Sequence, residues 1–100
     1  MAKEFEIRKR AIKILTDKNW ICWYPSKARY KQNDIFGIID LLAVKKKKIK
    51  KIQLTTLSNI SAKRKKITNF LKKNRVEMTV EIWAWSKKQK KFKKERINGS

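Results

Sequence analysis

The residue with the clearest chemical potential is Asp40, which lies inside the apolar segment 38–44 (IIDLLAV). A carboxylate in a buried strand costs several kcal/mol unless it is paired with a cation or binds a metal. Two interpretations stay open at this point. One is a salt bridge or a strand end that water reaches. The other is a ligand that binds Mg²⁺ (or Mn²⁺) through hard oxygen atoms.

Gln53 is the second candidate ligand, because a hairpin would place it beside Asp40. A turn near residues 46–47 joins two expected strands, 35–44 and 49–56, and pairs positions whose numbers sum to about 93. Opposed side chains on one face of such a pair have Cβ atoms roughly 5 Å apart. The carboxylate of Asp40 and the amide oxygen of Gln53 are therefore expected to share one cation.

Glu4 is the third candidate ligand, on a helix expected over residues 3–18. At about 100° per residue, Glu4 projects on the same side as the apolar stripe that contains Ile7, Ala11 and Leu15. The alternative is a simple favourable interaction between an acid and the positive N-terminus of the helix. Glu4 is of interest as a ligand because it could join the oxygen donors of Asp40 and Gln53.

The composition indicates a polyanionic partner. Lys and Arg number 29 against 8 Asp and Glu, which gives a formal net charge of +21. Solubility alone requires a net charge of magnitude about 2–8. With no His and a single Cys, the chain excludes a disulfide framework, a Cys/His zinc site and a His-based catalytic triad. We expect a nucleic-acid-binding protein.

Periodicity and punctuation predict an α/β fold. We expect one domain over residues 1–100, with a mixed central sheet flanked by helices that lie on opposite sides or both on one side. The expected helices are 3–18 and 62–74, and the expected strands are 20–24, 35–44, 49–56, 76–85 and a short edge strand 91–97.

The pattern also predicts where the protein acts. No apolar run approaches the roughly 18 residues of a membrane span, and the N-terminus lacks a signal-peptide core. We therefore expect a cytoplasmic protein with no membrane partner.

Over residues 3–86 the chain resembles the PD-(D/E)XK nuclease superfamily, and within it the archaeal-type Holliday junction resolvases and small phage nucleases. The resemblance is carried by an acid-bearing helix and by three segments: 19–27 (NWICWYPSK), 34–43 (DIFGIIDLLA) and 52–55 (IQLT). It implies a restriction-endonuclease-like αβββαβ core. It also implies a structure-selective, Mg²⁺-dependent DNA endonuclease that acts as a homodimer.

By this resemblance Asp40 takes the place of the first metal-binding Asp, Gln53 that of the second acid, and Thr55 that of the lysine that orients the attacking water. The site has thus lost a charge and a lysine. Candidates for the missing ammonium group are Lys51, on the same strand face, and the basic run that begins the next helix. We take Lys51 and Lys66 as the leading catalytic candidates. The helix acid of the family would align with Arg8, one turn from Glu4.

Basic residues around this site are expected to contact phosphates rather than read bases. They are Lys27, Arg29, Lys31, Lys45, Lys46, Lys47, Lys63, Arg64 and Lys65. The four Trp residues either stack on bases or pack in the core. Two alternatives to the nuclease remain: a catalytically impaired nuclease fold that only binds nucleic acid, and a structural RNA-binding protein, which would leave Asp40 unexplained.

Overall fold

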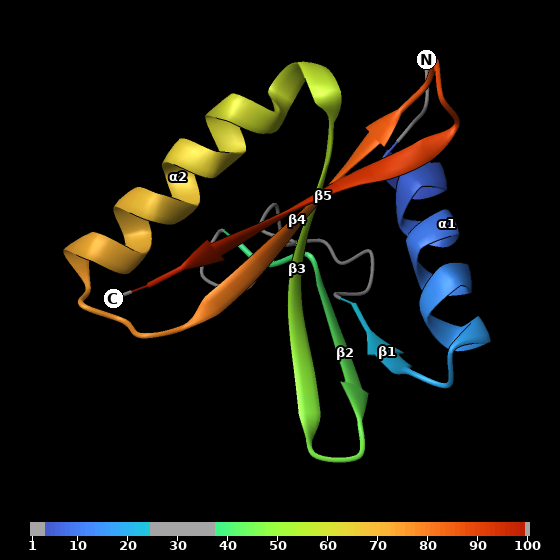
Figure 1. The fold of residues 1–100 in the computed structure, drawn as a ribbon, viewed down its shortest axis with the longest axis horizontal. Coiled ribbons are helices and arrows are strands. Elements are labelled where there is room, and N and C mark those ends of the chain that lie inside the picture. The colour runs from blue at the N-terminus through green and yellow to red at the C-terminus, as the bar shows by residue number, and fades with distance from the viewer. Residues whose placement is uncertain (1–3, 25–37, 100) are drawn as a thin grey trace, which may run out of the picture.

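A computed structural model describes residues 4–24 and 38–99 of the chain, and Figure 1 shows their arrangement. The order αβββαβ expected from the sequence is confirmed, and a further strand follows it. The elements are α1 (Glu4–Asp17), β1 (Ile21–Trp23), β2 (Leu41–Lys45), β3 (Lys48–Thr56), the short 3-10 helix η1 (Leu57–Asn59), α2 (Ile60–Lys73), β4 (Thr79–Ser86) and β5 (Lys91–Asn98).

The strands form one mixed sheet in the order β1-β2-β3-β4-β5. Strands β3 and β4 are parallel, and the other neighbouring pairs are antiparallel. A parallel pair needs a crossover connection, which α2 provides. Figure 1 shows α1 and α2 on opposite sides of the sheet. Of the two arrangements left open by the sequence, one helix on each face is therefore the correct one.

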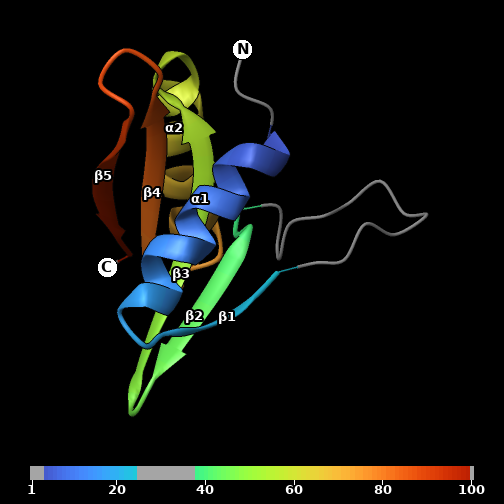
Figure 2. The ribbon, with the colours of Figure 1, turned by 90° about the vertical axis from the view of Figure 1, so that its right-hand side faces the viewer.

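Each helix covers its own hydrophobic cluster. The α1 face contains Ile7, Ala11, Leu15, Leu41, Ala43, Ile52, Leu54, Trp83 and Trp85. The α2 face contains Ile38, Ile39, Ile67, Leu71, Val80 and Ile82. In Figure 2, α1 crosses in front of the sheet. The alternation along β3 is as predicted, because Ile52 and Leu54 belong to the α1 face while Gln53 is paired with Ile82 of the α2 face.

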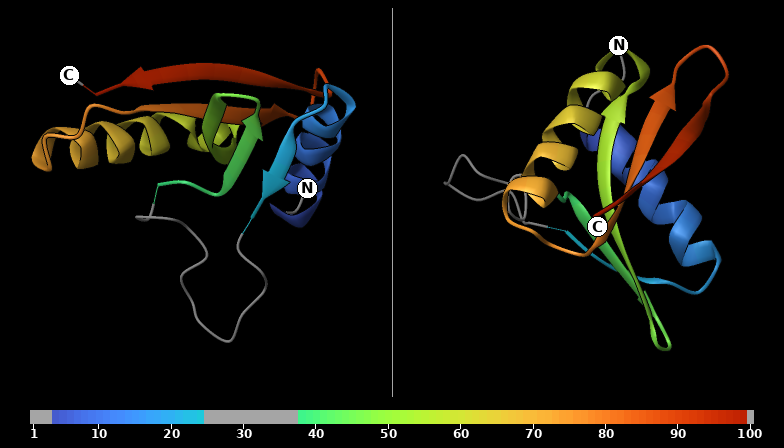
Figure 3. Two further views of the ribbon diagram at one scale, coloured as in Figure 1. Left: turned by 90° about the horizontal axis from the view of Figure 1, so that it is seen from below. Right: turned by 60° about the vertical axis from the view of Figure 1, so that its left-hand side comes forward.

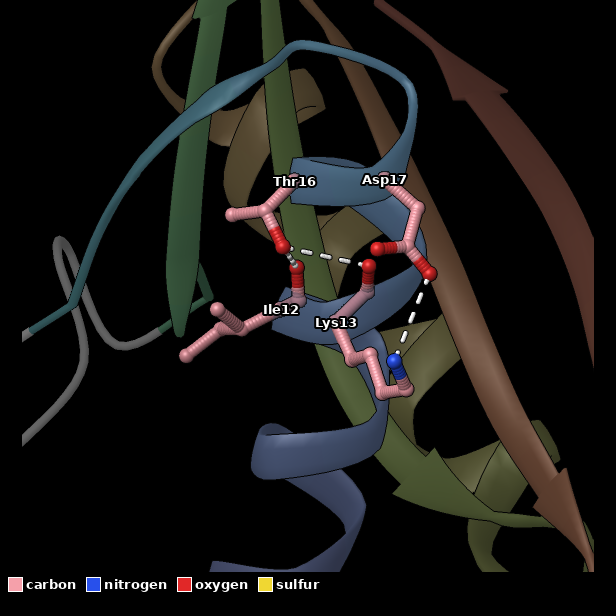
Figure 4. Close-up of polar contacts among 4 residues, drawn as sticks. All are labelled: Ile12, Lys13, Thr16 and Asp17. Carbon is pink, nitrogen blue, oxygen red and sulfur yellow. Dashed lines mark hydrogen bonds and ion pairs between the residues drawn. The ribbon is translucent and has the colours of Figure 1, made fainter.

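Polar contacts form within the last turn of α1, close to the residue at which the helix ends (Figure 4). The Thr16 hydroxyl donates to the carbonyl oxygens of Ile12 and Lys13, at 2.9 and 3.1 Å. Lys13 and Asp17 form an exposed pair at 3.6 Å, and such pairs contribute little. The chain then turns at Asn19, which has a φ of 69°, a conformation that Asn tolerates.

Several element boundaries differ from those expected. Strand β2 begins at Leu41 rather than at residue 35, so Asp40 lies just before the strand and not in its middle. Helix α2 begins at Ile60, two residues early, and Asn59 precedes it with no side-chain capping bond. Strand β4 begins at Thr79 rather than at residue 76, because the chain leaves α2 through Arg75, which has a φ of 52°.

The β2–β3 hairpin extends beyond the ends of β4 and β5, as Figures 1 and 3 show. Its turn is Lys46 and Lys47, and Lys46 adopts a φ of 55°. A residue with a Cβ atom pays about 1 kcal/mol or more for that conformation. Neither described helix is long and apolar enough to cross a membrane.

Candidate functional site

Asp40 and Gln53 meet as the sequence predicted. The observed register pairs Leu41 with Ile52, so opposed positions sum to 93. The Gln53 Nε2 donates to Asp40 Oδ2 at 2.6 Å, and the backbone N–H of Leu54 donates to the same oxygen at 2.8 Å. Asp40 is 7% exposed and Gln53 is 1% exposed. The expected proximity of Asp40 and Gln53 is confirmed, but the group of Gln53 that contacts the carboxylate is its amide nitrogen and not the oxygen expected to share a cation with Asp40.

The position of Asp40 outside β2 does not release its backbone. Its N–H donates to the Ile52 carbonyl at 2.9 Å, one residue out of the β2–β3 register, and this bond ties the backbone of Asp40 to β3. The side chain therefore stays on the α2 face, at the point where the ladder begins. Burial of the carboxylate is offset by hydrogen bonds to two neutral N–H groups, those of Gln53 and Leu54.

Gln53 Oε1 is the one buried side-chain oxygen or nitrogen within the described residues that lacks a hydrogen-bond partner. Leaving such an acceptor unsatisfied costs about 1–3 kcal/mol. Gln53 occupies both the second ligand position of the predicted site and the interior of β3. A water molecule or an ion could supply the missing partner of such an acceptor.

The described oxygen donors could hold a loosely bound magnesium ion, and they do not make up a closed metal centre. Within the described residues no group of three or more His, Cys, Asp or Glu side chains converges. Mg²⁺ commonly takes one or two carboxylates and fills its octahedron with water and substrate phosphate. The Asp40 carboxylate and Gln53 Oε1 supply that minimum. Glu4 begins α1, but its side chain lies outside what the structure describes.

Two lysines of the described chain flank this face, and one of them, Lys51, is among the two expected. Lys51 alternates with Gln53 on β3 and is half-buried, as predicted. Along α2, the predicted Lys66 is exposed and points away from the stripe formed by Ile67 and Leu71. Lys63 is half-buried beside that stripe. The geometry favours Lys63 over Lys66 as the α2 lysine nearest the site.

Arg64 shows which flank of α2 faces which strand. Its guanidinium donates to both carboxylate oxygens of Glu95 on β5, at 2.8 and 3.0 Å. The hydrogen bond to Glu95 raises the pKa of Arg64, and that from Arg64 lowers the pKa of Glu95. Because Lys63 precedes Arg64 by about 100° around the helix, it lies on the flank opposite β5. The guanidinium of Arg64, which we expected to contact a phosphate, is engaged in this ion pair.

The other predicted phosphate contacts divide into three groups. Lys46 and Lys47 are exposed at the hairpin turn, and Lys65 is exposed on α2. Lys45 donates to the Lys18 carbonyl at 2.9 Å and is 5.9 Å from the centre of the Trp20 ring. Three predicted residues lie outside the described residues: Lys27, Arg29 and Lys31.

The tryptophans do not act as a set. Trp83 and Trp85 belong to the α1-face cluster, at 2% and 8% exposure. Trp20 is half-buried, and Trp23 is 52% exposed. Of the four residues considered for base stacking, Trp23 is the one whose side chain offers most of its surface.

Sequence reasoning missed a polar cluster on the opposite face. Lys50 on β3 and Glu81 on β4 form an ion pair at 2.9 Å. The signal for it is the parallel register that sets Ile52 against Glu81, which is invisible until β3 and β4 are paired.

Comparison of the chain with protein-family models, with curated proteins and with solved structures finds no match. The functional argument therefore depends on the geometry and chemistry of these residues.

Proposed function

We propose that the protein is a metal-dependent endonuclease that hydrolyses phosphodiester bonds in DNA, acting on branched or otherwise distorted substrates. The single observation that carries the proposal is the buried contact between Asp40 and Gln53, in which Gln53 Oε1 has no partner among the described residues. Two oxygen donors of this kind are suited to a divalent cation that reaches full coordination only when a phosphate is present.

The chain around this pair supplies the attraction for DNA. The hairpin turn presents Lys46 and Lys47 beyond the ends of β4 and β5, at the end of the β2–β3 hairpin opposite to Asp40 and Gln53. Lys46 keeps a side chain at a positive φ, where glycine is the unstrained choice. An exposed lysine in such a turn can contact phosphates of the DNA backbone. Contacts of this kind fix position on the backbone and carry no base sequence.

A bound Mg²⁺ would activate water and neutralise charge on the scissile phosphate. Asp40 and Gln53 would hold the ion, and the Leu54 N–H keeps the Asp40 carboxylate oriented. Lys51 and Lys63, which flank the same face, would stabilise charge that develops on the phosphate. With one carboxylate in the described set, we expect weak metal affinity and slow turnover.

The test compares the protein with its Asp40→Asn variant on branched, duplex and single-stranded DNA and on RNA. Each substrate is incubated with Mg²⁺, Mn²⁺ or EDTA. Asn keeps an oxygen for the Leu54 N–H but loses the ligand charge. Asp17→Asn is the matched control, because Asp17 is an exposed acid at the end of α1 and its loss changes the net charge equally.

We expect cleavage of branched DNA with Mg²⁺ or Mn²⁺, none with EDTA, and a loss of at least about a hundredfold in Asp40→Asn but not in Asp17→Asn. Cleavage that survives Asp40→Asn would contradict the assignment of the site. Salt-sensitive DNA binding without cleavage would instead establish the second candidate function, a nuclease fold that only binds nucleic acid. Gln53 and Thr55, neutral where the resemblance expects an acid and a lysine, favour that candidate.

An exposed apolar row supports a homodimer on DNA. Ile21, Val44 and Ile49 are directly opposed across β1, β2 and β3 and are 71%, 38% and 53% exposed. They lie on the α2 face, as Gln53 does, so a second copy paired there would bring two sites together on a two-fold axis. Because two chains of charge +21 repel each other, we expect the dimer to form on DNA. Sedimentation with and without branched DNA, and with Ile49→Lys, tests this.

A further inference from the structure

The α1 face contains a cavity of about 580 Å³ that the proposed nuclease site does not use. Its apolar walls are Ile14, Leu15, Trp20 and Trp83. Its charged lining comes from the residue after α1 and from strands β3, β4 and β5, and consists of Lys18, Lys50, Glu81, Lys94, Glu95 and Arg96.

Two carboxylates of the described residues line this cavity, and both are already engaged: Glu95 accepts two hydrogen bonds from Arg64, and Glu81 is paired with Lys50. Glu81 accepts a hydrogen bond from Lys50 at 2.9 Å and another from the Trp83 indole N–H at 3.1 Å. It therefore neutralises Lys50 and fixes the indole of Trp83 in the floor. Within residues 4–24 and 38–99, no ion pair engages the side chains of Lys18, Lys94 or Arg96.

The cations are concentrated against an apolar floor. The Lys94 Nζ lies 4.2 Å from the centre of the Trp83 ring, and Lys50 Nζ lies 5.3 Å from that of Trp20. Desolvation, and then the nearby ammonium groups of Lys18 and Lys50, lower the pKa of Lys94, while Glu81 opposes the shift. Charges held close together in this way gain by binding an anion.

We propose that this cavity binds the phosphoryl group and base of a single nucleotide, with Lys18, Lys94 and Arg96 contacting the phosphate. The volume lies in the range of small-ligand pockets, about 300–1,000 Å³, and exceeds what a bare phosphate fills. Apolar walls beside the cations suit a base attached to that phosphate. The site is on the opposite face from Asp40 and Gln53, and the inference does not rest on the proposed nuclease.

The nucleotide has two possible sources, a free mononucleotide or the terminal nucleotide of a strand. Binding of dAMP, inorganic phosphate, and a short single-stranded oligonucleotide with or without a 5′-phosphate is measured by tryptophan fluorescence and calorimetry. EDTA is present throughout, so the metal-dependent site does not contribute. The variants are Lys94→Gln and Lys18→Gln. Lys88→Gln, in the exposed turn between β4 and β5, is the matched loss of one charge.

We expect dAMP to bind more tightly than inorganic phosphate, and Lys94→Gln and Lys18→Gln each to weaken dAMP about tenfold, as loss of one charge-assisted hydrogen bond does. Lys88→Gln should change it less than about twofold. If the 5′-phosphorylated strand binds more tightly than dAMP, the source is a strand end. The reverse order identifies a free nucleotide, and both orders support the site.

Equal weakening by Lys88→Gln and Lys94→Gln would overturn the proposal, because binding would then follow net charge alone. A second measurement needs no variant. Saturating dAMP should raise the pKa of the Lys94 ammonium group, followed by NMR, since the bound phosphate stabilises its charged form. A Lys94 pKa that dAMP leaves unchanged would also overturn the proposal.

Discussion

The two faces of the sheet differ in what they bury. Among the described residues four polar side chains are buried, and the alternation along the strands places them on the α2 face: Asp40, Gln53, Thr55 and Ser86. On the α1 face every described member of the buried cluster is apolar, and the charged groups line a cavity, where they are partly exposed. Partly exposed polar groups keep some of their hydration, whereas those in a core must be satisfied by protein partners. The buried polar groups of the α2 face therefore carry the larger desolvation cost, and a function would explain why they are there.

The largest loss of stability is expected when the buried indole of Trp83 is removed from the α1 face. Trp83→Ala removes a side chain that is 2% exposed, packs at 5.4 Å from Phe92 and donates to Glu81. We expect a loss of about 3–5 kcal/mol of unfolding free energy, measured by urea denaturation. Trp23→Ala, at an exposed position, is the control and should cost less than about 1 kcal/mol. A cost for Trp83→Ala no greater than the control would contradict the packing described.

On the α2 face, Asp40→Ala should rank next. It leaves the Gln53 amide and the Leu54 N–H without their shared acceptor, and we expect a loss of about 2–3 kcal/mol. Asp40→Asn keeps an acceptor oxygen and should lose less than half as much in the same denaturation experiment. If Asn proves as damaging as Ala, the hydrogen bonds are not what the carboxyl group contributes.

Gln53→Met should separate stability from function. Met has nearly the same shape as Gln. The substitution removes the unpartnered Oε1, which stabilises the fold, and it also removes the hydrogen bond to Asp40, which destabilises the fold. We expect the two to cancel to within about 1 kcal/mol, while metal-dependent cleavage is lost. A large destabilisation would show that Gln53 serves the core rather than a ligand.

The smallest effect is the pH dependence of the pair that joins α2 to β5. Because Arg64 lowers the pKa of Glu95 below its ordinary value of 4.5, the pair stabilises the fold fully above about pH 4.5 and less as the pH falls through the lowered pKa. Arg64→Met should therefore lower the melting temperature slightly at pH 7. The difference from the wild type should disappear at low pH. A difference that grows on acidification would contradict this linkage.

Much of the fold follows from local patterns in the sequence. The stripe Ile7, Ala11 and Leu15 predicts both α1 and the face it buries. The lysine-rich turn between two apolar runs predicts the hairpin register, and through it the contact of Asp40 with Gln53. The predictions of these features are correct because each feature depends on residues a few positions apart, or on one tight turn.

The features that the sequence did not predict depend on distant partners. The Arg64–Glu95 and Lys50–Glu81 pairs each join residues 31 positions apart, and no periodicity identifies them. Once Arg64 is turned toward β5, Lys63 rather than Lys66 flanks the site. The cavity on the α1 face likewise depends on strand β5. The sequence of β5 predicts only a charged edge strand, and its part in the cavity follows from its pairing with β4.

The crossover from β3 to β4 has a consequence for how the molecule assembles. Asp40 and Gln53 are 13 positions apart and meet through one hairpin, so closing that loop is entropically cheap and fast. Pairing β3 with β4 must await the ordering of α2, which makes it a non-local and slower step. We therefore expect the nascent chain to acquire its acid–amide contact early, and the nucleotide cavity only at the final docking of the C-terminal strands.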